Sequence, residues 1–160
     1  MHDAKAVGAM NHSTKISELD FSTEGDIDAI FMCGGHGTCV DFHSNPALKA
    51  AIETMYNAKK IVAAVCHGPV CLVDCVKADG SPLLEGLTVT TFSDAEEEMV
   101  GMTEKVPFLV ESKFHELGAK FEKAEEPWAS HVCADGNLVT GQNPASSTAC
   151  AKKVISILTE

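Results

Sequence analysis

The sequence predicts an α/β fold with three layers, in which helices cover both faces of a mostly parallel sheet. Two unbroken apolar runs, 29–33 and 61–65, have the length and composition of strands that are buried on both faces. Between them Asn45 and Pro46 form a helix start, and apolar residues then recur at helical spacing as far as Met55. This strand–helix–strand unit is typical of parallel sheets, in which helices connect neighbouring strands.

The remaining chain continues the alternation. After Cys66 we expect a helix, apolar almost all round, that runs to about residue 76. A strand is expected at 87–92, followed by a helix with the capping-box pattern Ser93-x-x-Glu96. Another helix is expected to run from 107 to 118, because a proline opens this segment and a glycine closes it.

The two ends of the chain differ in pattern. Residues 1–25 are polar and contain glycine, serine and threonine, so we expect them to be irregular. Residues 131–140 predict a hairpin around an Asp-Gly turn, and Pro144 opens a last amphipathic helix. The pattern contains no internal repeat or linker, so residues 1–160 are expected to form a single domain.

Composition excludes several classes of protein. The formal net charge of −11 repels polyanions, so nucleic acids and anionic membrane surfaces are poor partners. The seven cysteines are odd in number and include no C-x-x-C pair, which favours free thiols in a reducing compartment. The apolar stretch 61–73 is interrupted by His-Gly-Pro and is too short to span a bilayer. Because no signal peptide is visible, a cytoplasmic location is expected.

Cys66 stands where a buried strand ends and a helix is expected to begin. Ala64 and Gly68 place small residues two positions before and after it, as in a nucleophile elbow, whose tight turn exposes the nucleophile. A helix N-terminus stabilises an anion, so this pattern predicts a Cys66 thiolate with a lowered pKa. The alternative is a buried structural cysteine.

Two further groups belong to the same edge of the predicted sheet. Gly34 and Gly35 follow the preceding strand, and with the amide of His67 they are candidates for an oxyanion hole. His67 needs a carboxylate to fix its tautomer, and the acidic run 96–98 follows the next strand. The alternatives are an ordinary turn for the glycines and a solvated first helical turn for the glutamates.

These motifs together resemble a known family. The segments GGHG, AAVCHGP, TFSDAEEEMVG, VPFLVE, EEPW and DGNLVTGQNPASS occur in the order found in the glyoxalase III branch of the DJ-1/PfpI superfamily, which is class I glutamine amidotransferase-like. The similarity covers roughly residues 15–158. It implies a flavodoxin-like three-layer sandwich.

The resemblance also implies a site and a reaction. The implied triad is Cys66, His67 and Glu97, where Glu97 follows from alignment on the flanking phenylalanine and glycine. His36 and Trp128 correspond to residues that line the family's pocket, although Trp128 is equally consistent with a packing anchor. The implied reaction is the conversion of methylglyoxal to lactate without glutathione, cofactor or metal, by a glyoxalase III-type lyase of the D-lactate dehydratase class.

The chain departs from the family at its beginning. The family's first strand, the helix after it and its second strand have no counterpart, so the fold is expected to be N-terminally truncated. An acidic residue that hydrogen-bonds the family's nucleophilic cysteine is lost with them. We therefore expect either a fragment or a partner, a second copy or another chain, that completes the sheet.

These observations leave two hypotheses for the function. The first is a glutathione-independent glyoxalase, or a related thiol-dependent lyase, hydrolase or deglycase, acting on a small 2-oxoaldehyde. The second is a non-catalytic or redox-sensing subunit derived from a truncated family member. No metal site is expected, because His43, His115 and His131 lack ligand spacing with one another and the pair Cys71 and Cys75 is more typical of core packing.

Overall fold

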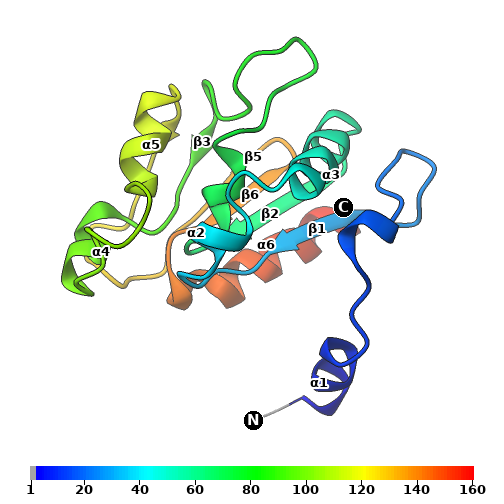
Figure 1. The fold of residues 1–160 in the computed structure, drawn as a ribbon, viewed down its shortest axis with the longest axis horizontal. Coiled ribbons are helices and arrows are strands. Elements are labelled where there is room, and N and C mark those ends of the chain that lie inside the picture. The colour runs from blue at the N-terminus through cyan, green and yellow to red at the C-terminus, as the bar shows by residue number, and fades with distance from the viewer. Residues whose placement is uncertain (1–2) are drawn as a thin grey trace.

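The computed structural model describes residues 3–160 and has at its centre a four-stranded sheet (Figure 1). Neighbouring strands follow the order β1-β2-β6-β5; the first three run parallel and β5 is antiparallel to β6. Their bounds are β1 (Ala29–Met32), β2 (Ile61–Val65), β5 (Val132–Asp135) and β6 (Leu138–Gly141). The predicted mostly parallel sheet is therefore confirmed, and so is the hairpin around Gly136.

Strand β2 shows why the fold has three layers. All five of its residues are buried. Val62 and Ala64 belong to the large core on one face of the sheet, whereas Ile61 and Ala63 belong to a second core on the other. Because successive side chains of a strand point to opposite faces, an unbroken apolar run needs a cover on both sides.

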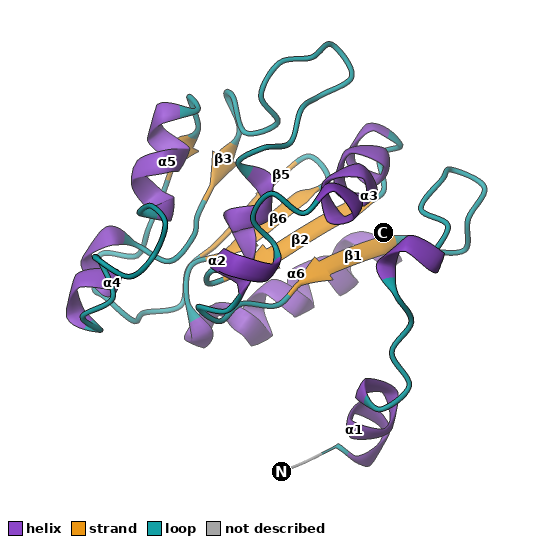
Figure 2. Ribbon diagram, viewed as in Figure 1, coloured by secondary structure: helices purple, strands orange, loops and turns teal. Residues whose placement is uncertain are grey.

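Helices supply this cover (Figure 2). One face packs against α3, whose start is capped by the side chain of Asn45, as predicted, and the other packs against α6. The helices are α1 (Ala4–Met10), α2 (Thr38–Asp41), α3 (Pro46–Asn57), α4 (Asp94–Met99), α5 (Val110–Glu116) and α6 (Ser147–Thr159). Three short 3-10 helices are η1 (Ile16–Glu18), η2 (Gly68–Leu72) and η3 (Pro144–Ser146).

The strand expected at 87–92 is shorter than predicted. Only β3 (Thr88–Val89) is regular, and it pairs in parallel with β4 (Lys120–Phe121) in a separate two-stranded sheet. The amide of Thr90 donates to the side-chain Oγ1 of Thr140 rather than to a backbone carbonyl. β6 already pairs with β2 and β5 on its two edges, so this segment contacts it through a side chain and not through a strand ladder.

Three other predictions of secondary structure are wrong. The helix expected from Cys66 to about residue 76 is only the five-residue η2, and all of its residues are buried beside α2 and α3. The helix expected from 107 begins at Val110 in α5, with Leu109 as its cap, while Gly118 ends it with a φ of +78°. Within 1–25 the described residues include α1 and η1, so this segment is not wholly irregular.

The two ends of the described chain lie differently. Helix α1 projects away from the body of the protein at the end of an extended segment, and its Met10 side chain is largely exposed (Figure 1). Helix α6 packs along the sheet. Among residues 3–160, no helix combines the length and the apolar character that crossing a membrane requires.

Gly68 marks a close backbone contact between η2 and β1. A Cβ atom at this position would lie 2.3 Å from the carbonyl oxygen of Met32, a distance that real side chains do not adopt. The contact therefore requires glycine and fixes the end of β1 against the turn after β2.

We predict that Gly68→Ala lowers the free energy of unfolding by about 1–3 kcal/mol, because the backbone of β1 or η2 has to move. The control is Gly37→Ala, which meets no atom within 4 Å and has a helical φ of −57°. It should change stability by less than about 0.5 kcal/mol. Urea unfolding followed by circular dichroism measures both variants, and equal stabilities would contradict this account.

Candidate active site

Cys66 lies on a strained turn between β2 and η2. Its φ of +61° is in the left-handed region, which non-glycine residues rarely adopt. Gly34 packs directly against the turn, where a Cβ would lie 2.6 Å from the Cβ of Cys66. The expected nucleophile-elbow geometry is therefore present, and small neighbours make it possible.

The sulfur of Cys66 lines a cavity of about 420 Å³ at the carboxyl ends of β1 and β2. In open α/β sheets this edge is where ligands bind. The residues lining the cavity are mainly apolar: Gly34, Gly35, His36, Val65, Cys66, Phe92, Val100, Trp128, Pro144 and Ser147. Its size suits a small molecule.

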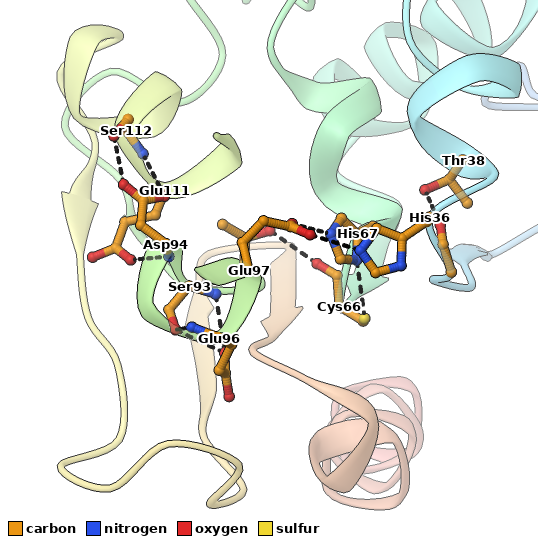
Figure 3. A network of polar contacts seen from close by, with 12 residues as sticks. His36, Thr38, Cys66, His67, Ser93, Asp94, Glu96, Glu97, Glu111 and Ser112 are labelled. Atoms are coloured by element: carbon orange, nitrogen blue, oxygen red, sulfur yellow. Dashed lines mark hydrogen bonds and ion pairs between the residues drawn. The ribbon is translucent and has the colours of Figure 1, made fainter. Parts of the chain in front are cut away.

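A chain of polar contacts runs from Cys66 through His67 to Glu97 (Figure 3). The Cys66 Sγ lies 3.4 Å from Nδ1 of His67, and Nε2 of His67 lies 2.6 Å from Oε2 of Glu97. An ionised carboxylate only accepts, so Nε2 of His67 carries the hydrogen and Nδ1 keeps a lone pair. That lone pair faces the thiol, which is the arrangement a general base requires.

His36 makes a second contact with the same carboxylate, which the sequence pattern did not reveal. Its Nε2 lies 2.7 Å from Oε1 of Glu97, and its ring centre lies 4.1 Å from that of His67 (Figure 3). Glu97 therefore accepts from two histidines, one on each oxygen. The ring of His36 lies at the cavity wall and is partly exposed, so it is both a lining residue and a clamp on Glu97.

The neighbouring glutamates have different environments. Glu96 completes the capping box of α4 with Ser93, and its Oε1 accepts from the backbone amide of Trp128 and the Nδ2 of Asn143. Glu98 is exposed. Of the three candidate carboxylates, only Glu97 contacts His67, in agreement with the alignment.

Trp128 lies at the edge of the cavity in a conformation that Glu96 stabilises. Its φ is +66°, and its ring packs edge-on against Phe92 with ring centres 5.6 Å apart. The hydrogen bond from its amide to Glu96 holds this strained backbone in place. The sequence allowed Trp128 to be a pocket residue or a packing anchor. In the structure it is both, because it lines the cavity and also packs against Phe92.

The expected lowering of the Cys66 pKa is wrong. Burial raises the pKa of the Cys66 thiol, and the charges of Glu96 and Glu97 add to this, against the opposing effect of the His67 and Gly35 amides. The predicted helix is only a short 3-10 turn, so it provides little dipole. Burial lowers the pKa of His67, although Glu97 opposes this, so that the imidazole is held neutral.

The amides that oppose the raised pKa are two of those expected in an oxyanion hole. The backbone N–H groups of Gly35 and His67 both act on the Cys66 thiol by lowering its pKa. Gly34, which was also expected in the oxyanion hole, instead permits close packing of the chain against Cys66. An oxygen bonded to a carbon on the sulfur would lie near the same two donors.

Native alkylation with iodoacetamide is expected to modify Cys33, which is exposed, and Cys66, which lines the cavity, before the other five cysteines. Those five are buried, and burial raises the pKa of Cys150 to about 11 and of Cys133 to about 12. Peptide mass spectrometry measures the order of modification, and denatured protein provides the control in which all seven react. Early modification of Cys150 in the folded protein would contradict the structure.

Comparison with known proteins agrees with this geometry. Residues 5–157 match the DJ-1/PfpI family. A Schizosaccharomyces pombe protein named as a probable glutathione-independent glyoxalase is 37% identical over 155 residues, which are 94% of this chain and 68% of that protein. The crystal structure of glyoxalase III from Candida albicans superposes with a TM-score of 0.80 at 33% identity, over 89% of this chain and 60% of that one.

A third protein is similar over the same region. The X-ray structure of the Francisella tularensis Rapid Encystment Protein 24 KDa gives a TM-score of 0.85 at 36% identity, over 95% of this chain and 66% of that one. The chain thus spans 60 to 68% of the length of these three proteins. By its sequence, its sheet and its superposition on these structures, the chain belongs to the DJ-1/PfpI family.

Proposed function

We propose that this chain carries the catalytic site of a glutathione-independent glyoxalase, which converts a small 2-oxoaldehyde such as methylglyoxal to a 2-hydroxy acid. The observation that carries the proposal is the contact chain from Cys66 through His67 to Glu97 at the wall of an apolar cavity. Similarity to proteins named as glyoxalases supports the same substrate class.

In the first step Cys66 adds to the aldehyde carbon. The Nδ1 of His67 accepts the thiol proton as the sulfur–carbon bond forms, so no preformed thiolate is needed. The aldehyde oxygen gains the electron pair of its C=O bond and receives hydrogen bonds from the Gly35 and His67 amides. Protonation of this oxygen gives a hemithioacetal.

In the second step hydrogen moves between the two carbons of the substrate. His67 removes the proton from the first carbon, and a proton returns to the second carbon. The hydroxyl group on the first carbon loses its proton and becomes a carbonyl, while the oxygen of the second carbon gains a proton and becomes a hydroxyl. The first carbon is oxidised to a thioester while the second is reduced, so the substrate supplies both halves of the redox change. Water then hydrolyses the thioester, releasing the hydroxy acid and restoring the Cys66 thiol.

Glu97 acts on this chemistry by positioning. It holds the Nε2 hydrogen of His67 and stabilises the imidazolium that forms when Cys66 loses its proton. His36 occupies the other oxygen of Glu97 and limits rotation of the carboxylate. The competing function, a redox-sensing or non-catalytic subunit, would need Cys66 but not this alignment of His67 and Glu97.

We further propose that another strand completes the sheet next to β1, supplied by a second copy of the chain or by a partner. Among the described residues β1 pairs only with β2, and its other edge carries unpaired backbone groups. Ala29, Ile30 and Phe31 are only partly buried in spite of their apolar character.

Glu97→Gln is expected to lower kcat for lactate formation by about 10²- to 10⁴-fold, because His67 loses the charge that stabilises its protonated form. Glu98→Gln changes the adjacent, exposed glutamate and serves as the matched control, with kcat within about twofold. The assay requires a preparation that turns over methylglyoxal, with circular dichroism to verify the fold. Equal losses in both variants would contradict the triad.

The pH dependence of kcat/KM is expected to have an acidic limb below pH 6.5, the ordinary value for histidine. Only neutral His67 accepts the Cys66 proton, and since burial lowers the pKa of His67, activity persists at pH 6.5 and falls as the pH decreases further. Glu97 raises the pKa of His67 against burial, so the residual activity of Glu97→Gln should have its limb at still lower pH. A limb above pH 6.5 in the wild type would contradict this assignment.

Residues 1–160 on their own are expected to be oligomeric or poorly soluble, with low methylglyoxal activity. The unpaired backbone groups at the edge of β1 favour pairing with a strand of another chain. Size-exclusion chromatography with light scattering gives the mass, and the lactate assay gives the activity. Replacing Phe31 by lysine, which places a charge on the half-buried edge strand, should reduce self-association. A soluble, active monomer would overturn the proposal.

A further inference from the structure

We propose that Glu122, His131 and Cys133 form a zinc site, separate from the cavity, at the place where the two sheets meet. Two of the residues lie on or next to β5 and the third follows β4, and their ligand atoms all lie within 4.8 Å of one another. The sequence predicted no such site, because its histidines lack ligand spacing with one another. The structure instead brings one histidine together with a cysteine and a glutamate.

The backbone of β5 positions two of the ligands. His131 and Cys133 are two residues apart, so their side chains leave the same face of the strand. Val132 between them packs with the core beneath α6, which places the other two on the opposite face, toward the small sheet. There the amide of Thr88 in β3 donates to Asp135 of β5, so the small sheet lies against this face (Figure 1).

Glu122 approaches from the small sheet. It directly follows β4, and its amide donates to the carbonyl of Val89 in β3. The backbone of His131 is held on both sides, because its amide donates to Ser146 Oγ and its carbonyl accepts from the amide of Gln142. Cys133 faces Thr140 in the β5–β6 pair. Each ligand is thus attached to backbone that hydrogen bonds fix.

The distances suit a tetrahedral zinc ion. Zinc bonds of about 2.3 Å to sulfur and about 2.0–2.1 Å to nitrogen or oxygen require about 3.6 Å between S and N and about 3.4 Å between N and O. The Cys133 Sγ lies 3.5 Å from His131 Nε2, which lies 3.9 Å from Glu122 Oε2. The Glu122 side chain is 60% exposed and free to swing the remaining few tenths of an ångström.

The ligand chemistry selects the metal. A thiolate, an imidazole and a carboxylate favour Zn²⁺ over Mg²⁺ or Ca²⁺, which prefer oxygen ligands only. Binding releases the Cys133 proton, and the two anionic ligands then balance the charge of the ion. Because the Glu122 side chain is exposed, water can reach the zinc ion and occupy its fourth ligand position. The ion would tie β4 to β5 and so join the two sheets.

Cobalt(II) provides the sharpest test, because its bond to a thiolate gives a charge-transfer absorption in the near ultraviolet. His36, His67 and Glu97 also lie close enough together to attract a metal, and Cys66 lies beside them, so the variants must separate the two clusters. We expect one equivalent of Co²⁺ to produce the absorption in the wild type and in Cys66→Ser, and the absorption to be lost in Cys133→Ser.

Zinc affinity gives an independent readout that does not depend on activity. Cys133→Ser and His131→Gln should each weaken Zn²⁺ binding by at least about tenfold in a chelator competition, since even outer-shell changes cost this much. Cys33→Ser, which changes an exposed cysteine, should bind as the wild type does. Zinc should also raise the Tm of the wild type but not of Cys133→Ser. Absence of zinc binding, or an absorption that follows Cys66 instead of Cys133, would overturn the proposal.

Discussion

Two glycine contacts hold the end of β1 against the turn after β2, and the geometry of the cavity depends on them. Gly68 lies against the carbonyl of Met32, and Gly34 lies against the Cβ of Cys66. Because backbone meets backbone here, the turn is short enough to force Cys66 into a positive φ. The Cys66 side chain therefore lies in a small buried cluster with Val65 and Phe92, where the Gly35 and His67 amides act on its sulfur. Side chains at either glycine would move Cys66 away from these amides.

The short helix α4 uses adjacent carboxylates for different purposes. Successive residues of a helix point about 100° apart, so Glu96, Glu97 and Glu98 face the Trp128 loop, the histidines and solvent respectively. Burial raises the pKa of the Cys66 thiol, and the charges of Glu96 and Glu97 raise it further. The site compensates with His67, which burial keeps neutral and ready to accept a proton. In the proposed reaction, these pKa directions favour proton transfer coupled to attack over a resting thiolate.

Patterns that are local in the chain could be predicted well. β2 was predicted at its observed bounds, since five successive buried residues suit only a strand covered on both faces. The Asn45 cap and the Ser93–Glu96 capping box were correct because their hydrogen bonds join residues at most three apart. The resemblance to a family added Glu97, which spacing alone could not distinguish from its neighbours.

The sequence by itself determined the α/β class, the strand that carries Cys66, and the segments that meet at its end, because burial and capping leave a periodic signature. Tertiary structure decided the length of η2, the shared carboxylate between His36 and His67, and the direction of the Cys66 pKa. A contact between residues 61 positions apart, such as that between His36 and Glu97, produces no repeating pattern in the sequence. A pKa depends on burial and on charges from several segments at once, and only the folded chain brings these together.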